Sequence, residues 1–79
     1  MKLSTLNYIH ELLKEDVKIK QNARSLLFDA AVKAQNEYLN DSSEENNRRW
    51  DEAEERYRSM MDVLWKAEEA LADFEHKEW

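Results

Sequence analysis

Two histidines are the residues best suited to metal or acid–base chemistry, and they lie near opposite ends of the sequence, at His10 and His76. Asp73 precedes His76 by three residues, so on a helix the two side chains share a face, as in metal sites of helical bundles. Such sites also need carboxylates that point inward from several helices. The inward positions expected near these histidines are apolar, Leu12 and Phe74 among them. We therefore expect exposed histidines and no metal or other cofactor.

The segment RRWDEAEERYR, residues 48–58, combines arginines with aromatic residues, a mixture that can bind phosphates and stack on bases. Four carboxylates are interleaved with the arginines, and Trp50 and Tyr57 fall on an apolar row. The formal net charge of the chain is −6, and residues 41–79 hold thirteen acidic and six basic side chains. We expect a solvated helix with internal ion pairs and no nucleic-acid binding.

Catalytic residues are not predicted anywhere in the chain. The sequence has no cysteine and no glycine, which removes a thiolate nucleophile and a glycine-rich phosphate loop. The serines are accounted for by helix caps or helix surface. We expect a protein that is not an enzyme.

The amino-terminal sequence MKLSTLNYIHELLKEDVK carries charges throughout and has no continuous apolar run. It therefore does not resemble a signal peptide. No segment approaches the roughly 18 apolar residues of a membrane span. We expect a cytoplasmic protein with no membrane partner.

The second half of the chain has the apolar spacing of a long amphipathic helix. Apolar residues recur there at alternating steps of three and four, as in a coiled coil. They are Trp50, Ala53, Tyr57, Met60, Leu64, Ala67, Leu71 and Phe74.

The first half follows the same rule and is also rich in good helix formers. Its apolar residues are Ile9, Leu12, Ile19, Ala23, Leu26 and Ala30. Asp16 and Lys33 stand where further apolar residues are expected. A break near KQNARS, residues 20–25, would instead give a three-helix bundle.

A turn is expected at residues 40–43, although the chain has neither glycine nor proline to make one. Ser42 with Glu45 fits the capping box that starts a helix, and Asp41 with Glu44 fits it one residue earlier. Asn40 can take the left-handed conformation that ends a helix.

The prediction is an all-α fold, a single domain of residues 1–79 with helices at about 4–39 and 43–77. Folding back at the turn brings the two apolar rows together as one coiled-coil-like seam. The predicted seam residues are Ile9, Leu12, Ile19, Ala23, Leu26, Ala30, Trp50, Ala53, Tyr57, Met60, Leu64, Leu71 and Phe74.

A second apolar row remains beside the first and would be left in water by a lone hairpin. It comprises Leu13, Val17, Leu27, Ala31 and Ala34 in the first helix and Met61 and Trp65 in the second. Two helices sharing one narrow seam bury too little to fold comfortably alone. We therefore expect a homodimer in which these residues form the interface of an antiparallel four-helix bundle.

The two ends of the chain, STLNYIHELLKE and ALADFEHKEW, resemble the ends of small uncharacterised helical proteins of Firmicutes and their phages. The resemblance covers about a third of the chain and implies a bacterial or phage source. It implies no activity.

The sequence favours an oligomeric helical hairpin that acts by contact with proteins, as an interaction or accessory protein. The alternative is an acidic inhibitor or antitoxin-like binder that mimics a nucleic acid and blocks a basic protein. That alternative needs the acidic face of the second helix, Asp51, Glu55, Asp62 and Glu69, to stay free.

Overall fold

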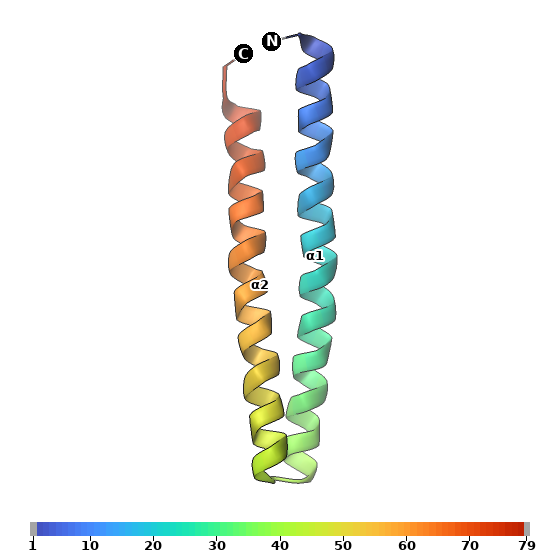
Figure 1. The fold of residues 1–79 in the computed structure, drawn as a ribbon, viewed down its shortest axis with the longest axis vertical. Coiled ribbons are helices and arrows are strands. Elements are labelled where there is room, and N and C mark those ends of the chain that lie inside the picture. Colours follow the sequence, from blue (N-terminus) through green and yellow to red (C-terminus); the bar gives the residue numbers. More distant parts are fainter. Residues whose placement is uncertain (1, 79) are drawn as a thin grey trace.

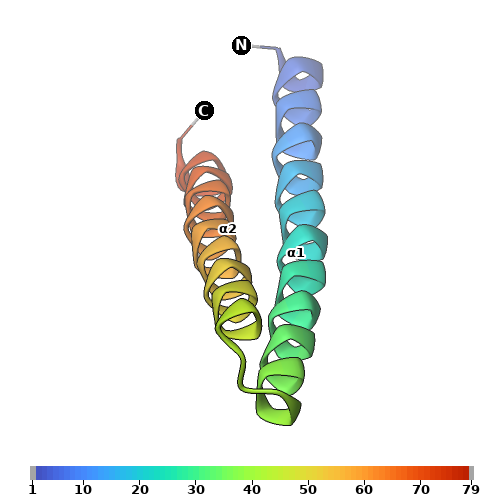
Figure 2. The same ribbon diagram turned by 60° about the horizontal axis from the view of Figure 1, so that its bottom comes forward.

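The computed structural model describes residues 2–78, which form two helices and no strand. Helix α1 spans Leu3–Asn40 and helix α2 spans Glu44–His76. Figure 1 shows them side by side in opposite directions, with the turn at one end and both ends of the described chain at the other. The rod measures 58 × 14 × 13 Å, and the turned view in Figure 2 shows no third layer. The predicted all-α, two-helix hairpin is confirmed.

Both helices are continuous because nothing in their sequences interrupts the backbone ladder. The chain has no glycine or proline, and α1 passes through residues 20–25 without a break. The three-helix alternative is therefore wrong. Each helix end lies one residue from the position expected.

The turn is built by side chains that replace the missing glycine. The Asn46 backbone N–H donates to Ser43 Oγ at 3.2 Å, so Ser43 caps α2. The Asn46 side-chain amide donates back to the Asp41 carbonyl at 2.9 Å. The Ser42 hydroxyl donates to the Tyr38 carbonyl at 3.1 Å, which satisfies a carbonyl at the end of α1.

Two expectations about the turn are corrected by this geometry. The cap of α2 is Ser43, one residue after the expected Ser42. Asn40 does not turn left-handed: no described residue has a positive φ, and Asp41 leaves α1 in an extended conformation. A left-handed residue is unnecessary because side chains already bond the last carbonyls of α1.

The buried core is small and lies between the middles of the two helices. Val17 of α1 packs with Leu64 and Ala67 of α2, and Leu71 extends the cluster towards the open end. Ala34 is the other buried residue in the described chain, nearer the turn. Neither described helix is long and apolar enough to cross a membrane.

Candidate interaction surface

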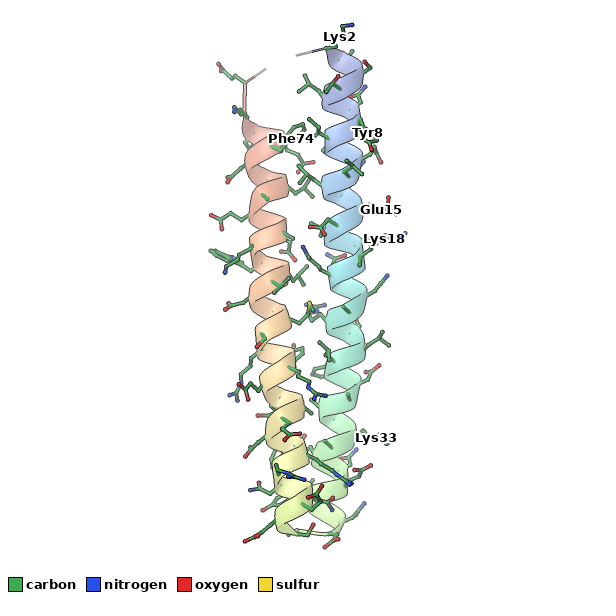
Figure 3. All side chains as sticks on the ribbon, in the orientation of Figure 1. Lys2, Tyr8, Glu15, Lys18, Lys33 and Phe74 are labelled. Carbon is green, nitrogen blue, oxygen red and sulfur yellow. The ribbon has the colours of Figure 1, made fainter. Side chains whose placement is uncertain are left out.

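The predicted apolar row of α2 lies on the face turned towards α1. Leu64 and Ala67 are buried. Half-buried neighbours complete the row, namely Trp50, Ala53, Tyr57, Met60, Leu71 and Phe74. Figure 3 shows Phe74 directed towards α1 at the open end of the hairpin.

The predicted row of α1, in contrast, is mostly turned away from α2. Leu12, Ile19 and Leu26 are 49%, 60% and 71% exposed, and Ala30 is exposed as well. A side chain packed between the two helices would be covered by α2 as well as by its neighbours on α1, so residues this exposed lie outside the seam. Ile9 and Ala23, which are half-buried, border it. The expectation that this row packs against α2 is wrong.

The α1 residues expected at a dimer interface are the ones that α2 covers. Val17 and Ala34 are buried, and the others are half-buried, namely Leu13, Leu27 and Ala31. Val17 and Ala34 therefore have little surface left for a second chain, and Leu13, Leu27 and Ala31 keep only part of theirs. The α1 row predicted for the dimer is used mainly within the hairpin. Of the predicted interface residues, Met61 and Trp65 of α2 remain exposed.

Charged residues interrupt both rows of α1, but the expected row contains Asp16, whose short side chain has no long apolar stem to cover the seam. Packing the expected row would place Asp16 and Lys33 inside the seam, where an unpaired charge is costly. In the observed packing Lys33 is exposed. Asp16 sits at the flank of the seam, 2.8 Å from the Lys20 ammonium.

The observed seam of α1 includes polar residues that the apolar pattern could not reveal. His10, Lys20 and Arg24 follow the same spacing as Val17 and are half-buried. The long stems of lysine and arginine cover apolar surface while their charged ends reach water. Steps of three and four residues counted in both directions from Val17 would have identified this row, provided that polar residues were accepted as members.

His10 is placed at the open end by a ring contact and a carboxylate. Its imidazole stacks on Phe74, with centroids 5.8 Å apart and planes 17° apart. Its Nε2 lies 2.8 Å from Glu75 Oε2. Residues 2–78 contain no group of three or more His, Asp or Glu side chains that could hold a metal ion.

Aromatic pairs join the helices nearer the turn. Tyr38 packs on Trp50 with ring centroids 5.3 Å apart, and Phe28 packs on Tyr57 at 5.4 Å. The Trp50 indole N–H also donates to Glu54 at 3.1 Å. These rings stabilise the hairpin, so Trp50 and Tyr57 are not free to stack on a base.

The arginines at the start of α2 pair with glutamates of the same helix. Arg48 and Arg49 both contact Glu45, and Arg58 contacts Glu54 at 3.1 Å. The hydrogen bond from Arg48 lowers the pKa of Glu45, and the same bond raises the pKa of the Arg48 guanidinium. The segment thus contains the internal ion pairs that its spacing predicts.

Large apolar side chains exposed on the hairpin make up its candidate binding surface. On one side of the rod, Leu12, Ile19 and Leu26 of α1 repeat at every seventh position, beside Val63 of α2. On the other side are Phe28, Val32, Met61 and Trp65, and Tyr8, Leu3 and Leu39 are exposed elsewhere on α1. Figure 3 shows Tyr8 on the side of α1 that faces away from α2, with Glu15 below it.

Comparison with known proteins gives no relative for this chain: no family model, no curated protein and no solved structure matches it. The resemblance of its two ends to small proteins of Firmicutes and their phages stays a prediction.

Proposed function

We propose that this protein is a non-catalytic interaction protein that works as a self-associating helical hairpin, most simply a homodimer in a four-helix bundle. The observation that carries the proposal is the exposed heptad row of α1. Leu12, Ile19 and Leu26 are each at least 49% exposed, although they repeat with the spacing of a helix–helix seam. A helix with two apolar rows has one row for each of two neighbours.

The thin core of the hairpin supports the same proposal. Four residues of the described chain are buried, and no large side chain is below 2% exposed. Small domains with so little buried area usually gain stability from disulfides, metals or oligomerisation. The chain has no cysteine, which leaves a second copy as the simplest source of further buried area.

A non-catalytic role agrees with how the reactive side chains are used. His10, expected to be exposed, is half-buried at the open end of the seam, where it contacts Glu75 and Phe74. Ser43 caps α2, and Ser42 donates to a carbonyl at the end of α1. These contacts position the helices and the turn, which is a structural use of each group.

Molar mass measured by light scattering over a dilution series tests the proposal. We expect a mass near twice the 9.5 kDa of one chain, falling towards one chain at the lowest concentrations. A mass of one chain at every concentration, with full helical circular dichroism, would refute self-association.

A second candidate function is the acidic binder of a basic protein, and one observation favours it. Glu55, Asp62 and Glu69 repeat at every seventh position on the exposed side of α2, with Asp51 one turn away. None of the four takes part in an ion pair within residues 2–78. They form an acidic stripe that could face a cationic surface.

Retention on immobilised cationic proteins tests this alternative, because screening weakens contacts between exposed charges. We expect retention at low salt, loss at high salt, and much weaker retention of a variant with Glu55, Asp62 and Glu69 changed to Gln. Equal behaviour of the variant and the wild type would argue against the alternative.

A further inference from the structure

One side of the rod carries a row from each helix. The outer row of α1 comprises Leu12, Asp16, Ile19, Ala23, Leu26 and Ala30. The adjacent row of α2 comprises Arg56, Ser59, Val63, Lys66, Ala70 and Asp73, all of them exposed. An open, mostly apolar groove lies between the two helices on this side, lined by Leu27, Glu55, Arg56, Ser59, Met60 and Val63. Leu27 follows Leu26 and is one turn from Ala23, so the groove adjoins both rows.

The outer row of α1 is complementary to the same row of a second copy that runs in the opposite direction. Set against a second, antiparallel copy, Leu12 meets Ala30 and Ile19 meets Ala23. Each large side chain then faces a small one, the alternation that lets helices pack closely. The remaining pair sets Leu26 against Asp16, whose carboxylate is already bound by Lys20.

The adjacent row of α2 is also complementary to the same row of an antiparallel copy, in this case mainly through opposite charges. Reversed against a second copy, Arg56 meets Asp73 and Ser59 meets Ala70. Val63 meets Lys66, whose methylene stem can cover it. Neither Arg56 nor Asp73 takes part in an ion pair within residues 2–78.

The centres of the two rows lie at the same position along the long axis of the hairpin. The contact between Phe28 and Tyr57 fixes the register of the helices. Counting from that contact towards the open end brings Ile19 level with Lys66, and it brings Ala23 level with Asp62, next to Val63. A single axis perpendicular to the rod therefore relates both rows to their copies, as an isologous dimer requires.

Charge explains why this side of α2 can face its own copy. Residues 41–79 hold thirteen acidic and six basic side chains, so two α2 helices repel unless opposed residues differ in sign. The Arg56–Asp73 pairing meets that condition. Asp62 and Glu69 lie on the exposed side of α2, outside the adjacent row. Glu55 reaches the groove beside Arg56, whose guanidinium carries the opposite charge.

We propose that two copies of this chain pack through the outer row of α1 and the adjacent row of α2, antiparallel, about a two-fold axis. The axis passes between Ile19 and Ala23 and between Val63 and Lys66, and it sets Arg56 against Asp73 of the second copy. This inference rests on the proposed self-association and specifies its geometry.

Charge reversal tests the geometry through the dimer dissociation constant. Arg56→Asp puts two carboxylates together at two symmetric places, and Asp73→Arg puts two guanidinium groups there. We expect either change to weaken the dimer by about tenfold, and the double variant to return within about threefold of wild type.

Arg58→Asp with Glu69→Arg is the control, because it makes the same charge changes outside the two rows at residues too far apart on α2 to pair with each other. We expect no mutual rescue in this pair. If the Arg56 and Asp73 effects simply add in a wild-type-like dimer, the proposed geometry is wrong while self-association stands. If the wild type is a monomer throughout, the proposed function and this inference both fail.

Disulfide trapping gives a second readout that does not depend on charge. The chain has no cysteine, so Ser59→Cys and Ala70→Cys each introduce one thiol on the exposed surface. We expect a mixture of the two variants to form mixed disulfide dimers at least about fivefold faster than either variant alone, because Ser59 faces Ala70 across the axis. Equal rates in the mixture and in each variant alone would overturn the antiparallel register.

Discussion

At the scale of single residues, the turn has no glycine and depends instead on hydrogen bonds from side chains. Ser43 caps α2 through the Asn46 backbone N–H at 3.2 Å. We expect Ser43→Ala to lower the free energy of unfolding by about 1 kcal/mol, because a donor of the first helical turn loses its acceptor. Urea denaturation followed by circular dichroism measures this change.

Ser42→Ala is the control for that substitution. Ser42 is exposed, and its hydroxyl donates to the Tyr38 carbonyl, which water can also reach. We expect a smaller loss than for Ser43→Ala. A larger loss would mean that the end of α1, and not the start of α2, limits the stability of the turn.

The contact between Glu45 and Arg48 gives the first turn of α2 a predictable dependence on pH. The bond lowers the pKa of Glu45 in the folded chain, so its stabilising effect is present above the ordinary glutamate pKa. The effect disappears as the pH falls through the lowered value. We therefore expect Glu45→Gln to melt below wild type at neutral pH and together with it in strong acid.

Glu44→Gln is the matched control, because Glu44 lies in the same first turn and takes part in no ion pair within the described chain. Both glutamates feel the positive end of the helix dipole. Thermal melts of both variants over a pH series separate the two effects. If they shift equally, the dipole and not Arg48 accounts for the pH dependence.

At the scale of elements, the sequence predicts the two helices, the position of the turn and the inner face of α2. These features depend on local patterns: heptad spacing, helix-forming residues and capping side chains. The face of α1 cannot be predicted in the same way. Either the row of Leu12, Ile19 and Leu26 or the row through Val17 could pack against α2, and contacts with α2 decide between them. The choice also depends on which packing leaves the charged ends of Asp16 and Lys33 in water.

The candidate surface is affected by the same ambiguity. Met61 and Trp65 remain exposed as the sequence predicts, whereas the α1 part of the surface lies on the other row. Periodicity shows that α1 has two apolar rows. It does not show which of them the chain covers by itself.

Leu64 is the most covered apolar residue of the seam, at 3% exposed. We expect Leu64→Ala to lower the free energy of unfolding by about 3 kcal/mol, because it leaves a cavity beside Val17 and Ala67. Leu39→Ala makes the same chemical change at a residue that is 67% exposed, so we expect a change within about 0.5 kcal/mol. Chemical denaturation of the two variants checks this, and equal losses would contradict the observed seam.

At the scale of the whole molecule, self-association links stability to concentration. A dimer that forms only from folded chains raises the melting temperature as concentration rises. We expect this rise for wild type and not for Ile19→Asp, which would place a carboxylate at the centre of the apolar interface. The hairpin itself should stay folded, because Ile19 is 60% exposed within one chain.

Val32→Asp is the control, because Val32 is exposed on α1 outside the outer row. We expect its melting temperature to keep the concentration dependence of wild type. Calorimetric scans at several concentrations make the comparison. If both variants lose the dependence, self-association uses more than one side of the rod.

The hairpin shape also decides how the chain responds to a pulling force. Both ends of the described chain lie at the same end of the rod (Figure 1), so tension applied there first loads the contacts at the open end, the His10–Phe74 contact among them. Layers then separate one at a time towards the turn, and each releases little energy because the core is small. The same molecule pulled between one end and the turn is loaded along a single helix, whose extension breaks its own backbone hydrogen bonds and disturbs many contacts with the other helix at once. One chain can therefore be weak in the first direction and much stronger in the second.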